Sequence, residues 1–205
     1  MDDTVAIALF RHGLTEDNKR HAYLGWTDSP LCLIEKEKMQ ANDNEYELFF
    51  SSDLNRCLET MEIMFQACNP LILSELRELN FGQWEKKTYG ELKHDPEYQK
   101  WLGSPFTVKP PEGESFFEFS TRVQAGWEKA IKKIIDSNVR KAAIMTHGGV
   151  IRHLLTKYAP EAKDFWEWKI PHGNGYELIW SLEVLREGER CTLLQEVPLT
   201  AKLNG

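Results

Sequence analysis

Two apolar segments of this chain end in the same way, in a histidine followed by glycine. One reads LFRHG and the other reads IMTHGG. Each apolar run is short and contains β-branched residues, which is typical of a buried strand. In an open α/β sheet, ligands bind in the crevice outside the carboxyl ends of the strands. We therefore expect His12 and His147 to meet in one crevice, where the glycines allow the backbone to turn tightly.

Strand-like and helix-like segments alternate along the rest of the chain. Such alternation favours a three-layer α/β/α sandwich with a mostly parallel central sheet. A capping box at Ser115 and Glu118 marks the start of a long amphipathic helix that ends near Ser137. The predicted strands are residues 5–10, 47–53, 70–73 and 142–146, the other predicted helices are 54–65 and 150–158, and a hairpin of strands 177–185 and 191–197 closes the chain.

The region at about 84–111 breaks this alternation, because it is rich in Trp, Tyr, Lys and Pro. We interpret it as a small helical insertion over the active site, within a single domain that spans 1–205. Its aromatic residues are expected to form a satellite core more often than a substrate platform. The aromatic residues in question are Trp84, Tyr98, Trp101 and Phe106, and the basic side chains available for substrate contacts are Lys86, Lys87 and Lys109.

Composition excludes several classes of partner. The chain of 205 residues has a net charge of −7 and no basic tail or stripe, which argues against nucleic acid or an anionic membrane as the main partner. No apolar run approaches the ~18 residues of a membrane span, and the amino-terminal MDDTVAIALF lacks the pattern of a secretory signal. We expect a cytoplasmic protein whose four cysteines are reduced. These cysteines, which lack the ligand spacing of a zinc site, are Cys32, Cys57, Cys68 and Cys191.

Charged side chains follow several of the predicted strands. Arg11 lies beside His12, Arg56 lies one turn into the helix after the second strand, and ELRELNFGQWE after the third strand carries several carboxylates. Guanidinium groups match phosphate oxygens in bidentate geometry. Two arginines with a histidine on each side suit a tetrahedral dianion better than a planar carboxylate, so the sequence predicts a site for a small tetrahedral anion such as phosphate.

Six motifs, in order, resemble those of the histidine phosphatase superfamily, the phosphoglycerate mutase-like proteins. The resemblance runs from residue 5 to about 180, and each motif alone is weak. The motifs are RHG with Thr15, Glu16 and Asn18, GWTDSPL (25–31), SSDLNRCLET (51–60), ELNFGQWE (78–85), PEGES (111–115) and THGGVIR (146–152).

The resemblance also implies roles for individual residues. His12 would be the nucleophile that forms a phosphohistidine, and Glu78, four residues before Gly82, would be the general acid. Glu75 and Glu85 compete with Glu78 for that role. The phosphate would be held by Arg11, Arg56 and His147, with Asn18 and Gly148, and neither a metal nor a cofactor is implied.

Three functions are compatible with these residues. The first is a metal-independent phosphomonoesterase of the phosphatase branch, similar to α-ribazole phosphatases and broad-specificity phosphatases. The second is a cofactor-dependent phosphoglycerate mutase, and the third is a non-catalytic phosphate-binding protein. The substrate, the oligomeric state and any closure of the insertion stay open. His172, in PHGNG, is kept as a pocket candidate with no assigned role, whereas His21, His94 and His153 are expected at the surface or in packing.

Overall fold

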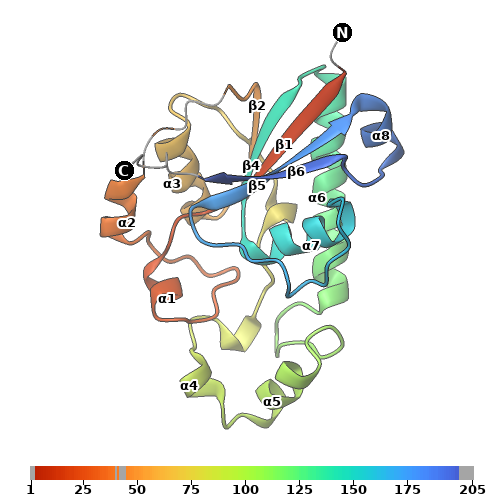
Figure 1. Ribbon diagram of the computed structural model, residues 1–205. Helices are drawn as coiled ribbons and strands as arrows, with labels where there is room; N and C mark the ends of the chain where they lie inside the picture. Colours follow the sequence, from red (N-terminus) through yellow and green to blue (C-terminus); the bar gives the residue numbers. More distant parts are fainter. Residues whose placement is uncertain (1–2, 40, 42–44, 199–205) are drawn as a thin grey trace.

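The computed structural model describes residues 3–39, 41 and 45–198. These residues form a mixed sheet with the strand order β3-β2-β4-β1-β5-β6 (Figure 1). Neighbouring strands from β3 to β1 are parallel, while β5 and β6 are antiparallel to their neighbours. The strands are β1 (Thr4–Arg11), β2 (Leu48–Ser51), β3 (Leu71–Ile72), β4 (Lys141–Thr146), β5 (Asn174–Ser181) and β6 (Leu193–Pro198).

Helices cover both faces of this sheet, as the sequence predicted. Alternate residues of β1 point to opposite faces. Ile7 and Leu9 join a core cluster with α6 and α7, whereas Phe10 joins a second cluster with α3. Figure 1 shows α3 on one side of the sheet and α6 and α7 on the other. The α-helices are α1 (Glu16–Lys19), α2 (Leu33–Lys38), α3 (Asn55–Met64), α4 (Tyr89–Leu92), α5 (Pro96–Gly103), α6 (Phe116–Asp136), α7 (Gly148–Tyr158) and α8 (Leu182–Glu187), and two 3-10 helices span Ser74–Leu76 and Gly82–Trp84.

The long helix α6 begins where the capping box predicted. The Ser115 side chain accepts a hydrogen bond from the Glu118 backbone N–H, and the Glu118 carboxylate reaches back to the Ser115 N–H at 2.8 Å. Two otherwise unpaired donors are thereby satisfied at the helix start. Among the described residues, no helix is both long enough and apolar enough to cross a membrane.

The hairpin predicted from strands 177–185 and 191–197 is wrong in its first strand. The strand expected over 177–185 ends at Ser181, and Leu182–Glu187 form α8 before β6 begins. The Ser181 hydroxyl caps the helix by accepting from the Val184 N–H, and Gly188 ends it with φ 73° in the left-handed region. Short apolar runs fit a strand or a helix equally well, so the caps decide the outcome here.

The region 84–111 contains the short helices α4 and α5, which lie beyond the carboxyl ends of the strands in Figure 1. Trp84, Tyr98 and Trp101 form a buried cluster of their own with Leu92, which confirms the expected satellite core for these three aromatic residues. Phe106 differs, because it stays 45% exposed and lies outside this cluster.

Candidate active site

His12 lies directly after β1 and is almost completely buried. Its backbone N–H donates to the Thr146 carbonyl at 3.0 Å, which ties the end of β1 to the end of β4. The ring Nδ1 lies 2.7 Å from the Gly13 carbonyl. A carbonyl only accepts, so Nδ1 carries the proton and Nε2 keeps its lone pair. Burial, together with the positive charge of Arg56, lowers the pKa of His12 well below its usual range.

His147 faces His12 from the end of β4, with 5.1 Å between the ring centroids. Arg56 Nη2 lies 3.3 Å from its Nδ1, and Ser52 Oγ lies 3.0 Å from its Nε2. Arginine can only donate, so Nδ1 accepts and Nε2 carries the hydrogen. Burial, and then the charges of Arg56 and Arg11, lower the pKa of His147 well below its usual range. The sequence therefore correctly predicted that the two strand-end histidines meet. The lowered pKa values leave both rings neutral.

Two arginines flank the histidines and are fixed by backbone carbonyls. Arg56 donates from Nη2 to the Gly25 carbonyl at 2.5 Å and from Nη1 to the Thr27 carbonyl at 3.1 Å. Arg11 donates from Nη1 to the Ile170 carbonyl at 2.5 Å. Burial lowers the pKa of Arg11 to about 10, so this side chain remains a cation at neutral pH.

Each of these arginines also has a donor without a partner. The Nε atoms of Arg11 and Arg56 are buried and make no hydrogen bond to any described residue. A buried N–H that lacks an acceptor costs about 1–3 kcal/mol. Two such donors beside a neutral, strand-fixed imidazole form a place where an anion with several oxygen atoms would supply the missing acceptors.

Glu78 is the carboxylate that the fold brings to this crevice. Its Oε2 accepts from the Gly149 N–H at 2.9 Å, and its Oε1 accepts from the Leu79 N–H at 2.9 Å. Gly149 lies in the first turn of α7, two residues after His147. Glu78 also lines a cavity of about 290 Å³ together with Arg11 and Asn18.

The two competing carboxylates have other partners. Glu75 forms an ion pair with Lys129 of α6. Glu85 accepts from the backbone N–H groups of Gly25 and Trp26, both at 3.0 Å, and holds that loop in place. Of the three glutamates, only Glu78 lines the cavity beside Arg11.

Asn18 and Gly148, the remaining predicted phosphate ligands, lie at the same crevice. The Asn18 side-chain oxygen accepts from the Thr15 hydroxyl at 2.9 Å, and Asn18 lines the cavity beside Glu78. A Cβ atom at Gly148 would lie 3.2 Å from Arg11 Cζ. Glycine at this position therefore lets the guanidinium group of Arg11 pack directly against the start of α7.

His172 also joins the site, as its place in the glycine-rich PHGNG had suggested. Its ring centroid lies 5.3 Å from that of His12, and its Nδ1 lies 3.4 Å from the His12 carbonyl oxygen. Burial, and then the charge of Arg11, lower the pKa of His172 to about 3. Three neutral imidazoles thus lie together, with His12 between the other two.

Two arginines of the site were missed by sequence reasoning. Arg152 lines the cavity, and its position three residues after Gly149 on one helix face is the signal that could have identified it. Arg122 donates to the Glu78 carbonyl at 3.1 Å and pairs with Glu114 at 2.7 Å, so it fixes the segment that carries Glu78. No sequence spacing indicates that second arrangement, because its members come from three separate segments.

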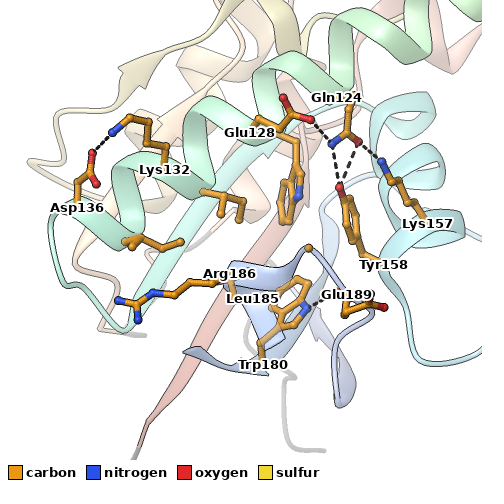
Figure 2. A pocket seen from close by; sticks show the side chains of 14 residues that line it. Gln124, Glu128, Lys132, Asp136, Lys157, Tyr158, Trp180, Leu185, Arg186 and Glu189 are labelled. Carbon is orange, nitrogen blue, oxygen red and sulfur yellow. Dashed lines mark hydrogen bonds and ion pairs between the residues drawn. The ribbon is translucent and has the colours of Figure 1, made fainter. Parts of the chain in front are cut away.

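A second cavity, of about 490 Å³, lies between α6, α7 and α8 (Figure 2). Its polar groups mainly contact one another: Gln124 donates to Glu128 at 2.8 Å and accepts from Lys157 at 2.9 Å, and Lys132 pairs with Asp136 at 2.5 Å. It shares no lining residue with the cavity beside Glu78. The groups suited to phosphate chemistry therefore lie at the strand ends and not here.

Known proteins resemble this chain in sequence. The chain matches the model of the histidine phosphatase superfamily (branch 1) over residues 7–193. "Probable phosphoglycerate mutase GpmB" of Escherichia coli O139:H28 (strain E24377A / ETEC) is 38% identical over 131 residues, which cover 60% of this chain and 61% of that relative. The match thus spans about three fifths of the curated relative's length.

Solved structures extend the likeness to nearly the whole chain. The alpha-ribazole phosphatase from Shigella flexneri superposes with a TM-score of 0.80 and 22% identity, covering 98% of both chains. A second structure, TTHB049 from Thermus thermophilus, has a TM-score of 0.68 and 29% identity, covering 93% of this chain and 98% of that one. Together with the strand-end histidines, the family match over residues 7–193 shows that this chain belongs to the histidine phosphatase superfamily, branch 1.

Proposed function

We propose that this protein is a metal-independent phosphomonoester hydrolase that acts on a small phosphorylated molecule through a phosphohistidine on His12. The unprotonated Nε2 attacks phosphorus, and the bond from phosphorus to the ester oxygen breaks. Covalent catalysis of this kind divides one difficult displacement into two easier steps. Water then attacks the phosphohistidine, which releases inorganic phosphate and regenerates neutral His12.

The remaining charged groups serve this sequence. Arg11 and Arg56 stabilise the oxygens of the transferring phosphoryl group, because a guanidinium group donates hydrogen bonds and carries positive charge. His147 supplies its Nε2–H when it turns from Ser52 to the phosphate, and Asn18 and Gly148 border the same space. Glu78 protonates the departing ester oxygen in the first step and removes a proton from water in the second. The positive charge comes from side chains, so the proposed mechanism uses no metal.

One observation carries this proposal. The Nδ1–H of His12 is engaged by the Gly13 carbonyl at 2.7 Å, while buried Nε donors of Arg11 and Arg56 lack acceptors. A neutral imidazole with an available lone pair beside two unsatisfied guanidinium donors fits attack on a phosphate dianion.

Acid-quench labelling tests the nucleophile. Wild-type protein mixed with a ³²P-labelled phosphate ester in the presence of a chelator should carry acid-labile, alkali-stable phosphate, and His12→Ala should carry none. His172→Ala is the matched control, because it removes a neighbouring imidazole and should leave the label detectable. Label of equal amount on His12→Ala, or turnover that survives in that variant, would place the chemistry elsewhere.

A cofactor-dependent phosphoglycerate mutase is the second candidate, and the 38% identity to a curated relative of that name favours it. A mutase holds a bisphosphate and therefore needs cations for a second phosphate group. Lys86, Lys87 and Lys109, which the sequence offered for substrate contacts, are not among the residues that line the cavity, and Lys109 instead pairs with Glu118 at 2.8 Å. Among the described lining residues, Arg152 is the one cation besides Arg11, and its Nε donates to the Trp168 carbonyl. We expect slow phosphate release from 3-phosphoglycerate, whereas fast, primer-dependent formation of 2-phosphoglycerate would establish the mutase.

A further inference from the structure

Among the described residues, eight aromatic side chains line the cavity beside Glu78. Tyr23, Phe81, Trp101 and Phe119 are four of them, and we call the other four the aromatic mouth: Phe106, Phe116, Phe165 and Trp166. They come from three segments, namely the turn after α5, the first turn of α6 and the turn after α7. The ring centroids of Phe106 and Phe116 are 4.7 Å apart, and those of Phe165 and Trp166 are 4.8 Å apart. The ring centroids of Phe106 and Phe165 are 5.9 Å apart, so the two sides of the aromatic mouth are in contact.

The aromatic mouth differs from the other aromatic cluster of the same region. Trp84 is 1% exposed and Tyr98 is 0% exposed, whereas Phe106 is 45% exposed and Trp166 is 55% exposed. The region can therefore bury large rings, and it leaves these two partly open at a cavity. Contiguous exposed apolar surface at a cavity mouth is typical of a ligand-binding site.

Charge is sparse on this side of the cavity. Of the charged lining residues, Arg11 and Glu78 are assigned to phosphoryl transfer, which leaves Arg152. Arg152 donates from Nε to the Trp168 carbonyl at 3.1 Å, and its guanidinium carbon lies 5.7 Å from the centroid of the Trp166 ring. This cation is held against an aromatic face, a geometry that also suits stacking on a planar ligand.

We propose that the leaving group of the substrate carries a planar aromatic ring, and that Phe106 and Trp166 determine this specificity. The proposal rests on the phosphomonoesterase function and names its substrate class. With the phosphate on Arg11 and Arg56, the ester oxygen lies near Glu78, and the rest of the molecule extends along the cavity toward the aromatic mouth. Flat apolar walls stabilise a ring there and offer a polar chain such as glycerol few partners.

A pair of esters with similar alcohol acidity isolates ring recognition from leaving-group chemistry. The substrates are 2-phenylethyl phosphate and ethyl phosphate, both esters of primary alcohols. In the wild type we expect kcat/KM for the phenyl ester to exceed that for the ethyl ester by about tenfold or more, the size of a well-packed aromatic contact. Phe106→Ala and Trp166→Ala should each reduce this ratio severalfold, and Trp166→Phe should retain most of it.

Phe117→Ala provides the matched control, because Phe117 follows Phe116 in the first turn of α6, is 76% exposed and does not line the cavity. It should leave the ratio unchanged. Equal kcat/KM for the two esters in the wild type would overturn the proposal. So would a Trp166→Ala variant that loses activity toward both esters in equal proportion.

Binding of phosphonates separates this proposal from the proposed function. Calorimetry on 2-phenylethylphosphonate and ethylphosphonate, which cannot be hydrolysed at the carbon–phosphorus bond, measures recognition without turnover. Tighter binding of the phenyl compound that depends on Trp166 supports ring recognition even if no ester is hydrolysed, and the phosphatase function alone then fails. Equal affinity for the two phosphonates overturns ring recognition whether or not esters are cleaved.

Discussion

The contact between Gly149 and Glu78 provides a direct test of the general acid. A Cβ atom placed on Gly149 would lie 2.2 Å from Glu78 Oε1. Ordinary contact between heavy atoms requires about 3.5 Å, so in Gly149→Ala the carboxylate must move by roughly 1.3 Å. A misplacement of this size in a reacting group costs on the order of 10²-fold in rate.

The loss should depend on the leaving group. An alkyl alkoxide needs a proton as it departs, whereas p-nitrophenolate leaves almost unaided. We therefore expect Gly149→Ala to reduce kcat/KM for ethyl phosphate by about 10²-fold, and that for p-nitrophenyl phosphate by less than about tenfold. Steady-state kinetics on both esters, at equal enzyme concentration, gives the two ratios directly.

The fold should tolerate this change. The displaced atom is the far end of a flexible side chain, and the Gly149–Glu78 hydrogen bond that is lost stabilises by about 1.5–3 kcal/mol. Alanine in place of glycine in a helix returns up to about 1 kcal/mol. The free energy of unfolding should therefore fall by roughly 1 kcal/mol, which urea denaturation can measure.

Gly90→Ala is the matched control for this variant. Gly90 is the second residue of α4, as Gly149 is of α7, and the nearest heavy atom to its added Cβ is 3.8 Å away. It should hydrolyse both esters as the wild type does. If folded Gly149→Ala loses kcat/KM in equal proportion for both esters, or for neither ester, then Glu78 does not act as the proton donor.

Three further outcomes are expected. Glu78→Gln should slow ethyl phosphate far more than p-nitrophenyl phosphate in steady-state assays, and equal losses would indicate a structural role. Glu85→Gln should lower the free energy of unfolding by roughly 2 kcal/mol and weaken inhibition by phosphate. The reason is that the Glu85 carboxylate accepts hydrogen bonds from backbone N–H groups of the loop at Gly25, and the Gly25 carbonyl in turn holds Arg56. Unchanged denaturation curves would contradict this prediction. Burial lowers the pKa of His153 from 6.5 to about 4. Between pH 6.5 and pH 4 the unfolded state therefore binds more protons than the folded state. The contribution of His153 to the free energy of unfolding is complete above pH 6.5 and is lost as the pH falls toward 4. In His153→Leu the drop in unfolding free energy between pH 7 and pH 5 should be smaller by roughly 2 kcal/mol, and an identical drop in both proteins would refute the assignment.

Strand ends and helix caps are the parts of this molecule that local sequence predicts well. His12 and His147 come together because two parallel neighbours, β1 and β4, must end at the same edge of a sheet. The capping box at Ser115 predicts the start of α6 because both of its hydrogen bonds form within four residues. In each case the pattern lies within one segment, or within two segments related by a simple rule of sheets.

Contacts between distant segments are the part that sequence could not supply. The turn that brings Gly149 to Glu78, and the arrangement in which Arg122 fixes the Glu78 carbonyl, depend on how α6 and α7 pack on the sheet. Composition does not distinguish a ring in a satellite core from a ring at a cavity mouth, so the sequence places Phe106 with its aromatic neighbours. Their exposures of 45% for Phe106 and 1% for Trp84 show the difference only after folding.

The central position of β1 has a consequence for local unfolding. Residues 6–10 pair with β4 on one side and with β5 on the other, so their amide hydrogens should exchange with solvent only when the whole domain unfolds. Phe106 and Trp166 lie in turns outside the sheet, where the backbone can open separately at much lower free energy. Mild denaturant should therefore release the aromatic mouth while His12 is still held in place, so that the protein loses its selectivity between esters before it loses the capacity to become phosphorylated.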